Sequence, residues 1–569
     1  MKGINRWAWL ILVVFFEGLA ALFFYFRIPS ETANSGLLGY SSSRWLIGGS
    51  FFFVQLLFLV GIIYILFHKQ VWEKLSNRFN QWLNSDSHTW FFRVLILVGL
   101  LACLEAYLLS YLSLPVHLRP LIFCLGLALL ETLAWSFWFF KKPLDLLASW
   151  RSLDRHQRWT FVVLIAIGFF FFCLIIPQNL HGAESLHSFN VAVNDENITY
   201  LPVQWMLKLT GKPEEWIYGL IVYEDYHYGY PFYFLSALVL LPVRLFLGPN
   251  FFEQTQLNLL ILRQMISSLP ILISSILLVW IYTHFRSWWK SLLLFLLILF
   301  IPNAVFYQIR FWHPDGLVVL AVVLTLFFLS RDRYKLGWNF YTAAVFCGLA
   351  SGIKLYGFFF VLSIAVYLLF CRFDGKIEWR RLINKGLLFI IVMVISIVLS
   401  NPFLGVPSAR DRMLQIQNEK ASQIGEGYHQ AGADDIYHVG LEAWLPSLEA
   451  GFGPAVFLAF LSGSLIIGSI WGQRRLLNLL TLAWVSMIGS YLLYFSAVKS
   501  QHYWLPAMLP LYGSALNLTD LQSTPGKEWF HIPLKFRQGL TWFCSAVVFI
   551  LIILNMTTTQ SVFTYFINP

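Results

Sequence analysis

The chain has 569 residues, of which 58% are hydrophobic and only 12% are charged, and its mean hydropathy is +0.67. A soluble domain of this size does not have such a composition, so we expect an integral membrane protein. The formal charge of +10 does not indicate nucleic-acid binding, because the Lys and Arg residues lie in short clusters between apolar runs. The six cysteines lie in or beside apolar segments without CxxC spacing, which indicates neither disulfides nor a zinc site.

Apolar runs of roughly 18 or more residues recur along the chain, and each can cross the ~30 Å hydrocarbon layer as a helix. The alternating pattern of barrel strands is absent, so the fold class is all-α: a polytopic transmembrane helical bundle of about fifteen helices. Four of them form an N-terminal module, residues 1–150, whose role is open, and residues 151–569 form the body. We expect the first four helices at 7–26, 45–67, 89–112 and 119–140.

Basic stretches fix the expected topology. KQVWEKLSNR (69–78) and KKPLDLLASWRSLDRHQR (141–158) are assigned to the cytoplasm by the positive-inside bias. A helix over 158–177 then delivers a first large loop, 178–257, to the extracytoplasmic face. Segment 231–248 is long enough to span, but we expect it to be re-entrant or interfacial, because that one choice places three later basic loops inside.

The remaining body helices follow from the same hydropathy pattern. A second large loop, 403–450, also falls on the extracytoplasmic side. The helices are expected near 264–284, 290–308, 316–330, 338–353, 355–371, 386–402, 451–471, 477–498, 503–519 and 538–556.

Charged and aromatic side chains concentrate at the junctions expected on the outer face, including the turns QIRFWHPDG, GIKLYG and VKSQHYWLP. Arg310, Lys354 and Lys499 break the positive-inside bias there. A cation at an outer membrane boundary is suited to pair with a lipid phosphate. The alternative is that these side chains only snorkel, or pair with acids such as Asp315.

Two adjacent acids, Asp195 and Glu196, lie in VNDENITYLPVQW (193–205), in the first large loop. An acid pair in a loop is often only solvated, but a carboxylate beside an apolar wall can have its pKa raised and act as a general base. In the same loop, Asp225 and His227 could help to hold a metal. Their spacing fits no strong metal motif, so no metal site is predicted. The sequence identifies no cofactor with certainty, and a divalent cation is compatible with it.

The order of these features resembles the GT-C superfamily of polytopic glycosyltransferases, in particular the protein O-mannosyltransferase and aminoarabinose-transferase branch, which is glycosyltransferase family 39-like. The acid pair Asp195-Glu196 is similar to that family's acidic pair in the first extracytoplasmic loop. The similarity covers roughly residues 155 to 520. Its other elements are YEDYHYGYPFYF (223–234), which resembles an aromatic-Asp-x-His-Pro-Pro-Leu motif; Arg263 at the start of a helix; Arg310 to Asp315; GLASGIK (348–354); and HYWLP (502–506).

Two features depart from the family pattern. Tyr-Gly-Tyr-Pro stands where the family has a double proline, and the N-terminal module lies outside the similarity.

The resemblance implies transfer of a sugar from a polyprenyl-phosphate donor to a lipid, glycan or protein acceptor, by direct displacement at the extracytoplasmic face. The sequon NIT (197–199) abuts the predicted site, which favours a bacterial or archaeal inner membrane. Besides donor and acceptor, the partners are membrane lipids and not nucleic acid. Asp195 would be the base, with Glu196 orienting or replacing it. Arg310, Lys354, Lys499 and His502 would contact the donor phosphate, and the substrate-binding set would be Asp225, His227, Tyr228, His313, Asp315, Tyr356 and Tyr503.

A different class, a lipid-linked sugar flippase or transporter, is the main alternative. Glu17, Glu105 and Glu131 each fall near the middle of an expected helix, where an ionisable residue suggests proton or ion handling. They could equally hydrogen-bond neighbouring helices in neutral form. A polymerase or ligase of surface polysaccharide is a further alternative. An enzyme is favoured because the polar residues of the body concentrate at one face.

Overall fold

The computed structural model describes residue 60 and residues 153–181, 194–208, 218–223, 225–309, 311–375, 377–426, 438–521 and 534–567. The chain divides into two units, residues 1–152 and residues 153–569, and apart from residue 60 the description concerns the second unit. The four expected N-terminal helices, with Glu17, Glu105 and Glu131, lie outside the described residues.

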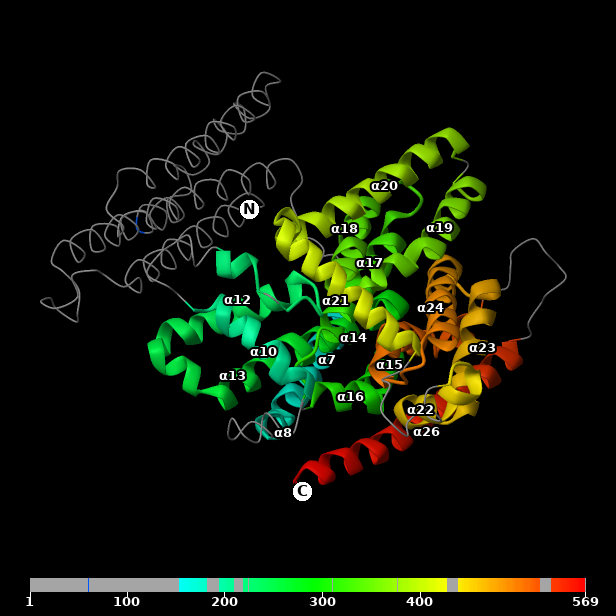
Figure 1. Ribbon diagram of the computed structural model, residues 1–569. Coiled ribbons are helices and arrows are strands. Elements are labelled where there is room, and N and C mark those ends of the chain that lie inside the picture. The colour runs from blue at the N-terminus through cyan, green and yellow to red at the C-terminus, as the bar shows by residue number, and fades with distance from the viewer. Residues whose placement is uncertain are drawn as a thin grey trace, which may run out of the picture. The chain divides into compact units, whose positions relative to one another are not determined.

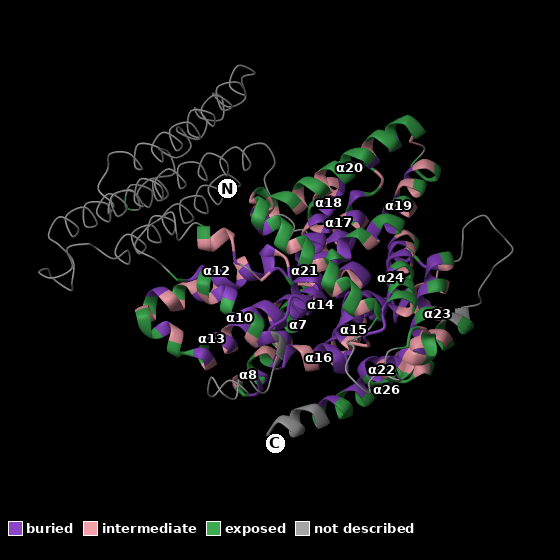
Figure 2. Cartoon of the chain, in the orientation of Figure 1, coloured by how far each residue is buried: buried purple, intermediate pink, exposed green. Residues whose placement is uncertain are grey.

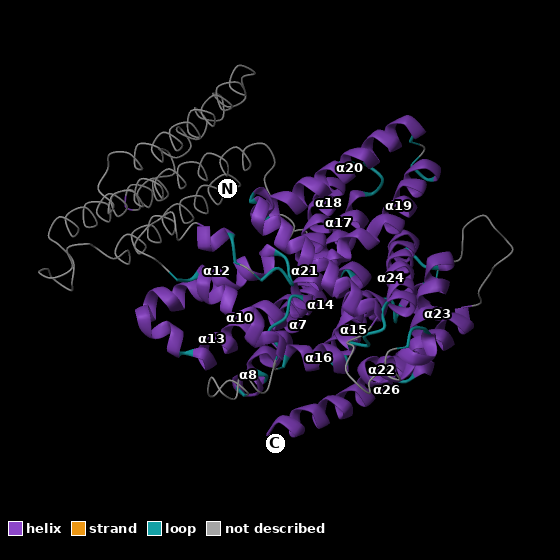
Figure 3. Cartoon of the chain, in the orientation of Figure 1, coloured by secondary structure: helices purple, strands orange, loops and turns teal. Residues whose placement is uncertain are grey.

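The described part of the second unit is a bundle of helices joined by short loops (Figure 1; Figure 3). It contains no strand, and its β-pairing is limited to an isolated bridge between Gly472 and Leu521. The all-α expectation is therefore confirmed. The first half of the unit comprises α7 (Arg155–Leu174), α8 (Ile176–Leu180), α10 (Asn194–Met206), α12 (Tyr230–Leu247), α13 (Thr255–Leu262), the π-helical η3 (Arg263–Ser268), α14 (Leu269–Thr283), α15 (Trp288–Leu299), α16 (Pro302–Gln308), α17 (Asp315–Asp332) and α18 (Trp338–Ile353).

The second half of the unit begins with the short 3₁₀ turn η4 (Leu355–Phe360). It continues with α19 (Val361–Phe373), α20 (Trp379–Ser400), α21 (Pro407–Glu426), α22 (Leu441–Phe452), α23 (Ala455–Trp471), α24 (Arg475–Phe495), η7 (Gln501–Trp504), α25 (Leu505–Gly513), η8 (Asn517–Asp520) and α26 (Leu534–Ile567).

Seven helical segments of the described residues are long and apolar enough to cross a membrane, or up to nine if each of two bent pairs counts as one span. The count of about fifteen is thus not confirmed. The bent pairs are α15 with α16, at 63°, and α22 with α23, at 89°. The seven segments are Arg155–Leu180, Tyr230–Glu253, Thr255–Thr283, Leu355–Phe373, Trp379–Ser400, Arg475–Phe495 and Gln538–Gln560.

One expected helix, 503–519, is interrupted in the structure. The segment forms only the nine-residue α25 between two 3₁₀ turns. Nine residues rise about 13.5 Å, less than half of the hydrocarbon layer. Pro506 and Pro510 lie in this segment, and a proline removes a backbone donor from a helix.

The core is built around α17, whose side chains are mostly buried (Figure 2). It packs against α14 and α18, and α18 packs in turn against α20. The outer side of α20 carries apolar residues such as Ile391, Val394 and Leu399, which suits contact with lipid.

Two glycines of α18 explain how closely it approaches α20. A Cβ on Gly348 would lie 2.5 Å from the Met393 carbonyl oxygen, and a Cβ on Gly352 would lie 2.6 Å from Ser400 Oγ. This spacing of small residues allows close helix approach within membranes. The glycines of the GLASGIK pattern therefore allow α18 to pack closely against α20, and Lys354 follows at the end of α18.

Segment 231–248, expected to be re-entrant or interfacial, is the single continuous helix α12. Its first residue, Tyr230, donates its backbone N–H to Asn401, at the end of α20. Near its other end, Arg244 Nε donates to the Leu207 carbonyl oxygen, directly after α10. A re-entrant loop would reverse direction, so α12 is not one.

The direction of the neighbouring helices relates α12 to the two ends of the bundle. Gln256, at the start of α13, donates to the Leu180 carbonyl oxygen at the end of α8, which follows α7. At the opposite end, Gln157 of α7 bonds the His284 carbonyl oxygen after α14. Residues 180 and 256 therefore share one end of the bundle, and residues 157 and 284 share the other. These contacts favour an interfacial α12, whereas its length and composition alone would also allow a span.

Candidate active site

The turn over residues 311–315 is held by three neighbouring elements. Trp312 donates its backbone N–H to the Glu196 carboxylate of α10 and its indole N–H to Ser236 Oγ of α12, at 3.0 Å. The His313 backbone N–H donates to Ser267 Oγ of η3, at 3.0 Å. These bonds fix the turn that starts α17.

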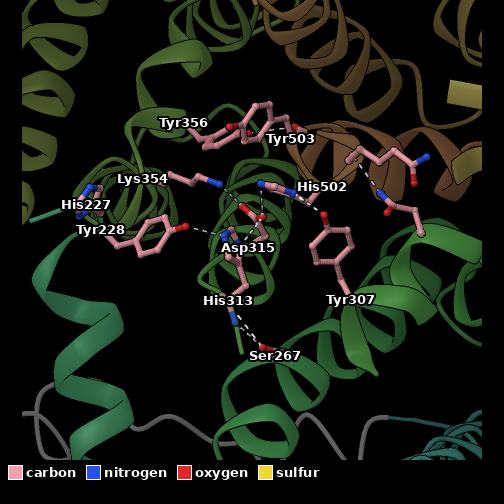
Figure 4. A network of polar contacts seen from close by, with 12 residues as sticks. His227, Tyr228, Ser267, Tyr307, His313, Asp315, Lys354, Tyr356, His502 and Tyr503 are labelled. Carbon is pink, nitrogen blue, oxygen red and sulfur yellow. Dashed lines mark hydrogen bonds and ion pairs between the residues drawn. The ribbon is translucent and has the colours of Figure 1, made fainter. Parts of the chain in front are cut away.

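Asp315 lies at the centre of a buried polar cluster at the first turn of α17 (Figure 4). Its Oδ1 lies 2.7 Å from the Lys354 ammonium, and its Oδ2 lies 2.7 Å from His313 Nδ1 and 3.8 Å from His502 Nε2. A carboxylate is also favoured at a helix N-terminus by the helix dipole. The cluster joins residues from α17, from the end of α18 and from η7.

Tyrosines surround the cluster. The Tyr228 hydroxyl lies 2.7 Å from His313 Nε2, and the Tyr307 hydroxyl lies 2.6 Å from His502 Nδ1. The Lys354 ammonium is also within cation–π range of three tyrosine rings. Its distances to their centroids are 5.1 Å for Tyr503, 5.6 Å for Tyr356 and 5.8 Å for Tyr228.

Tyr228 reaches the cluster because its segment lies directly against the end of α18. The Gly229 N–H donates to the Ile353 carbonyl oxygen, at 2.9 Å. A Cβ on Gly229 would lie 1.5 Å from the Gly352 carbonyl oxygen, so only glycine fits this approach.

A cavity of 440 Å³ opens beside the cluster. Its walls are mainly apolar and include Phe358, Phe359, Ile397 and Leu404. Lys354 and Tyr228 line it where it adjoins Asp315, so the cavity combines an apolar wall with a cationic end.

Helix α21 contributes a second cation to this cavity. Lys420 lines it, lies 4.2 Å from the Tyr228 ring centroid and donates to the His227 carbonyl oxygen at 3.0 Å. Gln417, one turn earlier, donates to the Tyr226 carbonyl oxygen at 2.6 Å. Two lysines from separate elements therefore flank one tyrosine.

Burial lowers the pKa of His502 well below its usual value, Asp315 acts in the opposite direction, and Lys354 lowers it further. A neutral imidazole keeps one ring nitrogen with a free electron pair.

Glu196 does not line the cavity. Its carboxylate is buried and forms a two-point ion pair with Arg263, at 3.0 and 2.6 Å. Arg263 also donates to the carbonyl oxygens of Asn179 and His181. Arg263, expected at the start of a helix, instead lies inside the continuous helical run that begins at Thr255. Glu196 and Arg263 together tie α10 to η3.

For Asp195 the structure describes only the backbone, in the first turn of α10 next to Glu196. The whole of Arg310 lies outside the described residues. The roles predicted for these two residues stay predictions.

Asp225 and His227 pair with each other, and the Tyr233 hydroxyl donates to Asp225 Oδ2 at 2.9 Å. Burial raises the pKa of Asp225, but His227 and Tyr233 outweigh it and the net direction is downward. His227 lines the cavity, whereas the Asp225 carboxylate is used in this local contact.

Lys499 is apart from the cluster. Its ammonium donates to the Ala497 carbonyl oxygen at 2.8 Å, and the residue is not among those that line the cavity. Burial lowers the pKa of Lys499. Of the four residues predicted to bind phosphate, the structure brings together Lys354 and His502.

Sequence reasoning missed Tyr307, Gln417 and Lys420. A signal for the last two was present in the second large loop, because Met413, Gln417, Lys420, Ala421 and Ile424 recur at helical spacing and all line the cavity.

Comparison with known families gives one match: residues 230–496 match the model of glycosyltransferase family 87, a GT-C-type family of membrane glycosyltransferases. No curated protein and no solved structure matches the chain. The match indicates a membrane glycosyltransferase, as the sequence suggested. The narrower resemblance to the family 39-like branch stays a prediction. The matched range includes His313, Asp315, Lys354 and Lys420 and ends before His502.

Proposed function

We propose that this multi-pass membrane protein transfers a sugar from a polyprenyl-phosphate donor to an acceptor hydroxyl at the extracytoplasmic face. The observation that carries the proposal is the cavity of 440 Å³ with apolar walls and lysines at one end. A lipid phosphate has the same division, an apolar chain and an anionic head.

The donor would lie with its phosphate near Lys354 and Lys420. The two ammonium groups approach one ring, that of Tyr228, at 5.8 and 4.2 Å from its centroid. An anion between them would be bound by charge-assisted hydrogen bonds. Asp315, which touches Lys354 at 2.7 Å, would keep that ammonium oriented rather than bind the donor itself.

The chemistry is a direct displacement. A carboxylate base, for which we propose Asp195, takes the proton of the acceptor hydroxyl, and the hydroxyl oxygen attacks the anomeric carbon. The bond from the anomeric carbon to the phosphate oxygen breaks, and polyprenyl phosphate leaves with the electron pair. The two lysines stabilise the charge that develops on the leaving phosphate. The anomeric configuration inverts.

The extracytoplasmic location is supported by the two ends of α17. Asp315 lies at one end, in the cluster, and Asp332 lies at the other, near the basic residues Arg331 and Arg333. Positive residues favour the cytoplasmic side, so the cluster would face the other side.

A flippase or transporter is a weaker proposal. Such a protein needs polar groups strung across the bilayer, whereas the cluster gathers around one end of α17.

The test is a transfer assay with purified protein, a panel of polyprenyl-phosphate hexoses and pentoses, and detection of the released polyprenyl phosphate. We expect at least one donor to be consumed by the wild type. Asp195→Asn should abolish transfer while expression and thermal stability stay normal.

The matched control is Asp411→Asn on α21, an exposed acid with 71% of its side chain accessible. It should keep wild-type transfer. Full activity of Asp195→Asn would remove Asp195 as the base, and lack of turnover with every donor by the wild type would contradict the proposed reaction.

A further inference from the structure

We propose that His313, Asp315 and His502 bind one divalent metal ion of the zinc and manganese class. Sequence patterns did not indicate this site, because its ligands come from two segments almost two hundred residues apart and include no HxH or HExxH spacing. The ligand atoms are His313 Nδ1, Asp315 Oδ2 and His502 Nε2, which all lie within 4.8 Å of one another.

The spacing of these atoms suits a small divalent ion. Two separations from Asp315 Oδ2 are 2.7 Å to His313 and 3.8 Å to His502. Neighbouring ligands at about 2.1 Å from a tetrahedral ion are separated by roughly 3.4 Å, so small side-chain shifts complete the geometry. Two imidazoles and one carboxylate, with further positions left open, are a common ligand set for such ions.

The tyrosines act on the far side of both histidine rings. A metal-bound histidine usually donates its other ring N–H to an acceptor, which fixes its tautomer and orientation. Tyr228 Oη lies 2.7 Å from His313 Nε2, and Tyr307 Oη lies 2.6 Å from His502 Nδ1. Both rings can therefore direct an electron pair towards Asp315.

The Asp315 carboxylate is buried, with 1% of the residue exposed. Its Oδ2 lies 2.7 Å from His313 Nδ1 and 3.8 Å from His502 Nε2. Lys354 bonds the other oxygen, Oδ1, so it leaves Oδ2 available.

The ion would join η7 to the start of α17 and add positive charge beside Lys354. Its effect on sugar transfer rests on the proposed function, but its binding does not.

The test is metal content, measured without any substrate. The full chain is purified in detergent, stripped with EDTA, equilibrated with Zn²⁺ or Mn²⁺ and analysed by inductively coupled plasma mass spectrometry. We expect about one ion per chain in the wild type and less than a tenth of that in His502→Gln and His313→Gln. The control is His156→Gln, an exposed histidine of α7 outside the cluster, which should keep the wild-type value.

A second measurement does not depend on how the variants fold. Co²⁺ bound to the wild type should give the visible absorption of a four- or five-coordinate nitrogen and oxygen site, and excess Zn²⁺ should remove it. Absence of bound metal in the wild type, or equal metal content in wild type and in folded His502→Gln, would overturn the proposal. Neither result bears on whether the chain transfers sugar, which the donor assay decides separately.

Discussion

Lys354 is the residue on which the proposed donor site depends most. Its ammonium touches Asp315 at 2.7 Å and is surrounded by three tyrosine rings at the edge of the cavity. The sequence singled it out as a cation that breaks the positive-inside bias. The sequence left two interpretations open for Lys354, contact with a lipid phosphate or pairing with an acid. The structure is compatible with both, because Lys354 lines the cavity and also pairs with Asp315.

We predict that Lys354→Ala lowers kcat/KM about a hundredfold, because the variant lacks a positive charge that stabilises the leaving phosphate. The effect should fall on the lipid donor more than on the acceptor. Steady-state kinetics with each substrate varied in turn measures this. Lys335→Ala, an exposed lysine near the other end of α17, is the control and should change little. Equal weakening of donor and acceptor would count against a phosphate contact.

Glu196 illustrates what a sequence motif leaves open. The sequence predicts that Glu196 orients or replaces Asp195, and in the structure the Glu196 carboxylate bonds Arg263 and Trp312 in a buried contact. Its partners are 67 and 116 residues away in sequence, so no local pattern could indicate them. These contacts hold the turn that leads to Asp315, and the role predicted for Glu196 in the reaction stays a prediction.

Arg263→Ala should destabilise the protein by about 3–5 kcal/mol, because it leaves a buried carboxylate without its partner. Unfolding in mixed detergent and SDS micelles measures the free energy. The double variant Glu196→Leu with Arg263→Met should be less destabilised than Arg263→Ala alone, since neither charge is then left buried. If the double variant is the less stable one, the ion pair itself stabilises the fold.

At the scale of elements, the apolar periodicity predicted α18 to the residue and α12 within one residue. It failed where backbone chemistry interrupts an apolar run, as at Pro506 and Pro510. The helical spacing of the residues of α21 that line the cavity is visible in the sequence, but a polar helix with that spacing is equally typical of a solvated one, so the spacing alone does not place α21 against the cavity.

Helix α21 has a testable role in donor binding. Lys420→Ala should raise the KM for the lipid donor about tenfold, because a cation at the cavity is lost while the base remains. Arg412→Ala is the control, since Arg412 is an exposed cation of the same helix that contacts Gln415. A fall in kcat without a change in KM would show that Lys420 contributes only in the transition state and not to binding of the donor.

At the scale of the whole molecule, the described unit has two chemically different ends. One gathers Asp315, Lys354 and His502. The other is basic, and there Lys290 pairs with Asp520 at 2.6 Å, and Arg474 donates to the Ile281 carbonyl oxygen. Two independent criteria assign the same residues to these two ends: the distribution of positive charge and the contacts between helices.

Cysteine labelling tests that division and the placement of α12 together. In a chain without its own cysteines, Arg286→Cys, Asn250→Cys and Asn418→Cys each provide one exposed thiol. A membrane-impermeant maleimide should label positions 250 and 418 in intact cells, and position 286 only after permeabilisation. Labelling at position 250 decides whether α12 is interfacial or spans the membrane, because a spanning α12 would place residue 250 on the same side as Arg286. Labelling of 286 in intact cells would reverse the orientation, and the sugar transfer proposed for the outer face would then have to occur in the cytoplasm.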